Sequence, residues 1–177
     1  MFCIKQAKNI VDLAGLKSLY YALIHSHLAY CPIILNCFSK SNMKKLEKSQ
    51  RKSIRVITKK RYNANTAELF IQQQILPLDK IIKQAKLLFM HSVVHNYAPI
   101  SFIDVWDLNA NRPNNYNLRN DNDFTLPNPR IEQFKRLPIY SLPLEWNMAG
   151  NLIYYENRTT FRMALRNQLF AELHPLN

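Results

Sequence analysis

One short segment constrains the fold of this chain more than any other feature. Residues 40–61 hold ten lysines and arginines and a single acidic residue, Glu47. At 100° per residue, six of the cations fall within an arc of about 100° on a helix: Lys44, Lys48, Arg51, Lys52, Arg55 and Lys59. A second group falls on a nearly opposite arc: Met43, Leu46, Ile54 and Ile57, with Gln50 and Ser53. The pattern predicts an amphipathic helix that buries one face and projects cations from the other.

The same segment points to a partner. It carries +9 of the net charge of +12, and the distance from Lys44 to Lys59 is about 22 Å along a helix, enough for about six phosphates of one strand. Solvated helix faces normally mix charges of both signs. We therefore expect contact with a nucleic-acid backbone of low sequence specificity, with Arg61 and Tyr62 as flanking candidates. A plain solvated face and an acidic lipid or protein partner remain alternatives.

Composition sets the class of protein. With 177 residues, 47% of them hydrophobic, the chain fits one domain, or one and a small appendage, and not disorder throughout. Its three cysteines are too few for a secreted disulfide scaffold, and its start lacks a signal-peptide pattern. The most apolar window, residues 19–35, is too short for a membrane span and contains Pro32. We expect a soluble intracellular protein of the cytoplasm or nucleus.

The spacing of apolar residues and the positions of helix-capping residues predict a mainly α-helical fold. Apolar residues at helical spacing predict helices over residues 10–31, 78–96 and 157–173. Ser39 or Ser41 is a plausible N-cap for the basic helix, and a short helix is expected to start at Thr66.

The composition and the expected secondary structure of the chain change after residue 98. Eight asparagines in residues 109–128 predict a loop. Two proline-flanked segments, 124–126 and 136–140, predict an edge β-hairpin. Three regions follow: a helical bundle over 1–98, an Asn/Pro-rich linker over 99–130, and a small C-terminal region of short strands and a helix over 131–177.

Motifs for phosphate or dinucleotide binding are excluded, because the chain has only two glycines, Gly15 and Gly150. The close acidic pairs, Asp104 with Asp107 and Asp121 with Asp123, lie in or beside the Asn-rich region with no apolar strand before them. They are expected to be loop and cap residues, since a two-metal site holds its carboxylates rigidly.

Zinc ligation is also disfavoured. His25 and His27 are about 200° apart on a helix, and the spacing of Cys31 and Cys37 is unusual for a zinc site. We expect His27 and Cys31 on the core side of the helix. His91 and His95 have the i, i+4 spacing of a metal-binding pair but no third ligand nearby in the sequence. No cofactor or metal is expected on this chain.

Several segments, taken in order, resemble the reverse transcriptases of non-LTR (LINE-type, jockey-like) retrotransposons. Residues 19–30, LYYALIHSHLAY, resemble the segment that follows the palm in that family, although residues 34–38 replace its tryptophan-containing stretch. Residues 46–57 look like the family's next helix. Shorter similarities follow at 63–70, 75–78, 116–120, 124–127 and 144–147. The resemblance covers the chain from about residue 10 to 173.

The resemblance implies a thumb-like region that contacts the template–primer duplex, an RNA/DNA hybrid or duplex backbone. It also implies that the catalytic aspartates and the magnesium they hold belong to a palm upstream of this chain, so that the chain has no polymerase activity of its own. The alternative function is a helical protein-interaction module that docks an acidic partner. A third possibility, an active polymerase fragment, would require an in-frame palm immediately upstream.

Overall fold

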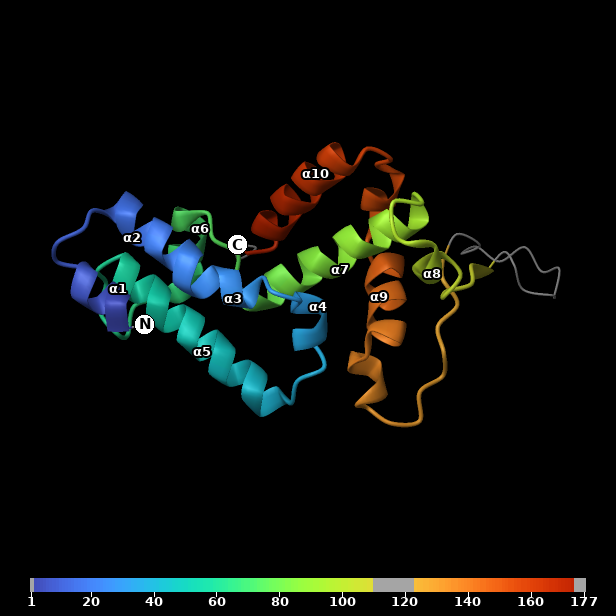
Figure 1. The fold of residues 1–177 in the computed structure, drawn as a ribbon, viewed down its shortest axis with the longest axis horizontal. Coiled ribbons are helices and arrows are strands. Elements are labelled where there is room, and N and C mark those ends of the chain that lie inside the picture. Colours follow the sequence, from blue (N-terminus) through green and yellow to red (C-terminus); the bar gives the residue numbers. More distant parts are fainter. Residues whose placement is uncertain (1, 110–122, 174–177) are drawn as a thin grey trace. The chain divides into compact units, whose positions relative to one another are not determined.

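The computed structural model describes residues 2–109 and 123–173. These residues are mainly helical (Figure 1). The α-helices are α1 (Phe2–Ala7), α2 (Leu13–Tyr20), α3 (Ser26–Leu28), α4 (Pro32–Leu35), α5 (Lys40–Ile57), α6 (Thr66–Gln73), α7 (Leu78–Val94), α8 (Ile100–Ile103), α9 (Pro138–Asn147) and α10 (Arg158–Ala171). The described residues also form a π-helical turn, Tyr21–His25, and the 3₁₀ turns Phe134–Arg136 and Gly150–Tyr154.

The chain forms two compact units, and each is described by itself. Unit 1 comprises Met1–Ile82 and Leu169–Asn177, and unit 2 comprises Lys83–Gln168. Helices α7 and α10 therefore contribute residues to both. The three regions expected from the sequence stay a prediction, and residues 110–122 of the expected linker lie outside the described residues.

In unit 1, the helix predicted over residues 10–31 is confirmed from Leu13 to Leu28, with the π-helical turn in its middle. It begins after Asp12, whose Oδ1 accepts the amide hydrogen of Gly15 at 2.9 Å and so caps the first turn. Figure 1 shows α5 lying along α2 and α3. The two segments share a core with α1 and α6: Ile4, Leu16, Tyr20, Ile54, Ile57, Leu69, Phe70 and Ile75.

The helix predicted over residues 10–31 stops short of Pro32. It ends at Leu28, and Pro32 begins a new helix, α4. Cys31 precedes it with φ of 49°, in the left-handed region, which redirects the chain. Proline suits the first position of a helix because its φ is already helical and its missing amide hydrogen would have no partner there.

The β-hairpin predicted in the C-terminal half is also wrong: within residues 2–109 and 123–173 there is no strand or sheet. Phe124 forms only an isolated bridge with Leu108. Its backbone is held by Asn147, whose side chain accepts from the Phe124 N–H and donates to the Phe124 carbonyl, both at 2.9 Å. The second expected strand lies instead at the start of α9, because Pro138 occupies the first turn of that helix.

Helix α9 contains a second proline, Pro143, in its interior. A proline there cannot donate to the carbonyl four residues earlier, which belongs to Ile139. That carbonyl accepts the indole N–H of Trp106 at 3.0 Å instead. The helix therefore keeps an interior proline, because the carbonyl left without a helical partner binds the segment after α8.

Candidate nucleic-acid interface

The basic helix is α5, and its position is fixed from both the cap and the core. Ser39 is its N-cap, and the Ser39 hydroxyl oxygen accepts the amide hydrogen of Asn42 at 3.3 Å. The buried face is as predicted from Gln50 onward: Gln50, Ser53, Ile54 and Ile57 are buried, and Met43 and Leu46 are half-buried.

Gln50 fixes this face by hydrogen bonding as well as by packing. Its Nε2 donates to the Tyr20 hydroxyl and to the Leu76 carbonyl, both at 3.0 Å. Burial is the main cause that raises the pKa of Tyr20 to about 12, and the bond from Gln50 opposes it. The tyrosine is therefore neutral at physiological pH, and α5 is joined to α2 through a satisfied polar contact in the core.

The opposite face of α5 carries five of the predicted cations, which differ in how far they are exposed to solvent. Lys44, Lys48 and Arg51 are exposed, whereas Lys52 and Arg55 are half-buried. The acidic residue of the helix, Glu47, lies 3.8 Å from Arg51. This ion pair is partly exposed on both sides and is therefore worth at most about 1 kcal/mol. The row from Lys44 to Arg55 spans about 16 Å, the length of about five phosphates along one strand.

Arg55 has an internal role that the sequence did not indicate. Its Nε donates to the Ala64 carbonyl at 3.0 Å, and its guanidinium lies 5.6 Å from the centre of the Tyr62 ring. Tyr62 remains 73% exposed. Arg55 therefore supports the turn after α5, and the Tyr62 ring beside it stays largely exposed to solvent.

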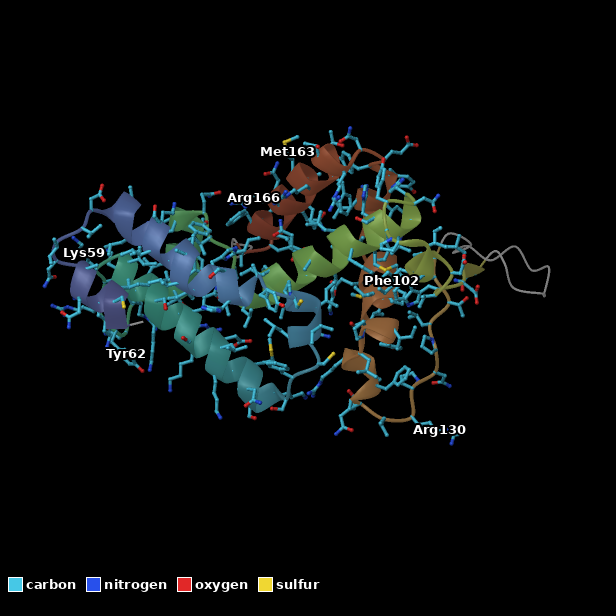
Figure 2. All side chains as sticks on the ribbon, viewed as in Figure 1. Lys59, Tyr62, Phe102, Arg130, Met163 and Arg166 are labelled. Carbon is cyan, nitrogen blue, oxygen red and sulfur yellow. The ribbon has the colours of Figure 1, made fainter. Side chains whose placement is uncertain are left out.

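The prediction that Lys59 continues the helical row is wrong. Helix α5 ends at Ile57, and Lys59 has φ of 54°. Lys59 and Arg61 lie instead in the turn toward α6. Figure 2 shows Lys59 and Tyr62 at the same end of unit 1, where α5 ends.

Two exposed cations of α5 were not among the predicted contacts. Lys40 and Lys45 both lie within about 20° of the edges of the predicted arc. The signal was present in the helical periodicity, and a slightly wider arc would have included both residues.

The candidate metal ligands weighed from the sequence can be placed only where the structure describes them. Within residues 2–109 and 123–173, no group of three or more His, Cys, Asp or Glu side chains could hold a metal ion. His27 and Cys31 are exposed, so their expected place on the core side is wrong. Asp104 lies just after α8, and Asp121 lies outside the described residues.

His91 and His95 form a pair in the interior of unit 2. Their rings are 4.3 Å apart, and the His91 ring stacks on Phe161 at 4.3 Å. His91 Nε2 lies 2.8 Å from the Tyr155 carbonyl, to which it donates. Burial is the main cause that lowers the pKa of His91, and electrostatic interactions with the neighbouring His95 and Arg158 act in the same direction. His91 is therefore a neutral core histidine.

Within the described part of the chain, none of the helices combines the length and the apolar character that a membrane crossing requires. Comparison with known proteins identifies no relative: no family model, no curated protein and no solved structure matches the chain. The resemblance to non-LTR reverse transcriptases therefore stays a prediction.

Proposed function

We propose that this chain is a nucleic-acid-binding, non-catalytic segment of a reverse transcriptase of the non-LTR retrotransposon type. In this proposal α5 contacts the phosphate backbone of the template–primer duplex. One observation carries it: α5 presents seven basic residues with one acidic residue, Glu47, while its opposite face is fixed in the core of unit 1. The backbone positions of the cations are therefore fixed before a partner binds.

This arrangement suits a phosphate backbone for a physical reason. Each cation that neutralises a phosphate releases condensed counterions, so binding gains free energy without reading bases. A rigid helix also loses little backbone entropy on binding. The exposed ring of Tyr62 beside Arg55 adds a place for a base at the end of the row.

The proposal gives this segment no catalytic step. Its motifs resemble the region that follows the palm, and the aspartates and magnesium of such a polymerase belong to the palm. The expected contribution of the segment is affinity and positioning of the duplex, with low sequence specificity.

Affinity for a 16-base-pair RNA/DNA hybrid, measured by fluorescence anisotropy against salt concentration, tests the proposal. If the five cations Lys44, Lys48, Arg51, Lys52 and Arg55 engage phosphates, log K falls against log salt with a slope of about −4 to −5. The triple variant Lys44→Glu, Lys48→Glu, Arg51→Glu should lose at least about a hundredfold in affinity at physiological salt, and its slope should be less steep by about three.

A matched control separates the α5 row from total charge. Lys5, Arg130 and Arg162 are exposed cations on other elements, and changing all three to Glu makes the same change in net charge. This variant should keep most of the affinity and the slope. Equal losses in both variants, or an affinity independent of salt, would show that α5 is not the contact surface. Tighter binding to a polyglutamate peptide than to the hybrid would favour the protein-interaction alternative.

A further inference from the structure

The end of α5 holds a cavity that the row of cations does not explain. It has a volume of about 320 Å³ and lies within unit 1, between the start of α2, the end of α5 and the end of α6. We call it the Lys59 cavity, defined by Leu13, Ile57, Thr58, Lys59, Lys60, Gln72 and Gln73. Its volume is at the lower end of the range for small-molecule sites, roughly 300–1,000 Å³.

Four kinds of side chain line the Lys59 cavity, and one of them is Thr58, whose hydroxyl donates to the Ile54 carbonyl at 2.9 Å. Leu13 and Ile57 provide apolar surface, and Gln72 and Gln73 provide amides that can both donate and accept hydrogen bonds. Lys59 and Lys60 provide two adjacent ammonium groups. None of the described residues that line the cavity is acidic. Apolar surface, amide and cation together match the parts of a nucleotide: the base plane, the base edge and the phosphate.

The backbone places the two lysines at this cavity at some cost. Lys59 has φ of 54°, a region that a non-glycine residue adopts only when its surroundings impose it. Two hydrogen bonds close the end of α5 around it: Lys59 N–H to the Val56 carbonyl at 3.2 Å, and Lys60 N–H to the Arg55 carbonyl at 3.0 Å. The turn therefore fixes both lysines beside the cavity.

We propose that the Lys59 cavity binds the 5′-terminal nucleotide of a strand through its phosphate monoester. A terminal monoester carries a charge of about −1.5 to −2 at pH 7, against −1 for an internal phosphate, and so matches two adjacent lysines. This inference rests on the proposed function, because the strand in question is one that α5 holds. It adds a preference for strand ends that an even row of backbone contacts would not produce.

The test compares two oligonucleotides and three small competitors on the full chain. A 12-nucleotide DNA with a 5′-phosphate should bind at least about tenfold more tightly than the same DNA with a 5′-hydroxyl. AMP should compete with the 5′-phosphorylated DNA and so remove its advantage in affinity. Adenosine and inorganic phosphate should each compete with that DNA at least about tenfold less well. Equal affinity for the two DNA ends, or competition by inorganic phosphate equal to that of AMP, would overturn the nucleotide site.

Two variants locate the effect. Leu13→Trp fills the cavity from a half-exposed position without changing charge, and it should abolish the preference for a 5′-phosphate. Lys59→Asn with Lys60→Ala removes both cations, while asparagine still tolerates the left-handed backbone. It should abolish the preference too. The control Lys5→Asn with Arg162→Ala removes two exposed cations on other elements and should keep it.

These outcomes are distinct from those that test the proposed function. If the salt slope on the RNA/DNA hybrid is steep but the 5′-phosphate preference is absent, the cavity proposal fails and the backbone interface stands. If hybrid binding is independent of the α5 row while the preference is lost in Leu13→Trp, the proposed function fails and the nucleotide site stands. A preference that survives in Leu13→Trp with unchanged folding, judged by circular dichroism, would contradict the cavity as its source.

Discussion

Helices α5 and α7 are nearly equal in length, 18 and 17 residues, and both carry lysines, but the lysines have different surroundings. On α7 each of the three meets a carboxylate from another element. Lys80 pairs with Glu172, while Lys83 and Lys86 lie 3.9 and 3.8 Å from the two carboxylate oxygens of Glu145. On α5 the described contacts include one ion pair for seven cations, and it is formed within the helix.

The difference shows that a lysine's role depends on its neighbours more than on its helix. The α7 lysines are half-buried or buried, and their charges are compensated inside the fold. Their contribution is to hold α7 against the elements that carry the glutamates. The α5 cations have no such compensation among the described residues apart from Glu47, so they remain available to an anionic partner.

The largest effect on stability is expected on the buried face of α5. Gln50→Met keeps the length of the side chain but removes both hydrogen bonds from Nε2, which leaves the buried Tyr20 hydroxyl and Leu76 carbonyl without that donor. We expect a loss of about 2–4 kcal/mol in the free energy of unfolding, measured by urea denaturation. Ser49→Ala, on the exposed neighbour, should change it by less than about 0.5 kcal/mol. A loss below about 1 kcal/mol for Gln50→Met would show that this contact does not fix the helix.

A smaller effect should separate the lysines of the two helices directly. Lys86 is 7% exposed, and Lys86→Met removes one of the two lysines that face Glu145. We expect a loss of about 1–3 kcal/mol in unfolding free energy and no change in the salt slope of hybrid binding. Lys48→Met should do the reverse, with stability within about 0.5 kcal/mol and a slope less steep by about 0.9. The contrast between the helices would be contradicted if both variants lowered the unfolding free energy, or if both changed the salt slope.

The smallest effect concerns the buried histidine of α7. The folded state lowers the pKa of His91, so the unfolded chain takes up the proton first as the pH falls. The stabilisation from neutral His91 is full above about pH 6.5 and is lost as the pH falls through its folded-state pKa. Melting temperatures of the wild type and His91→Gln between pH 7.5 and 5 measure this, and the variant should show a weaker pH dependence. A pH dependence in His91→Gln equal to that of the wild type would contradict this role of His91.

Local signals explain why α5 and α6 could be predicted from the sequence. The Ser39 cap, the buried face from Gln50 to Ile57 and the start of α6 at Thr66 all depend on residues within one or two helical turns. The end of α5 could not be predicted in the same way. It is set by the contact of Arg55 with Ala64 and by the left-handed turn at Lys59, which periodicity does not encode.

Two prolines lie where the predicted and the observed elements differ. Pro138 lies within the segment expected to be a strand, residues 136–140, and Pro32 directly follows the segment expected to be helical, residues 10–31, yet both prolines begin helices. A proline can interrupt a helix or strand, or it can begin a helix, and the conformation of the neighbouring backbone determines which of these occurs. The carboxylates that pair with the α7 lysines were also beyond sequence reasoning, because Glu145 and Glu172 are brought to α7 only by the tertiary fold.

Pro143 links two positions that are far apart in the sequence. Any other residue at position 143 would bring an amide hydrogen that could also donate to the Ile139 carbonyl, which would then no longer depend on the Trp106 indole as its donor. The free-energy cost of replacing Trp106 should then depend on which residue stands at position 143, so that the two substitutions are not additive. A backbone donor missing from α9 thus makes these two positions epistatic, and a residue can be accepted at one of them only in the context of the other.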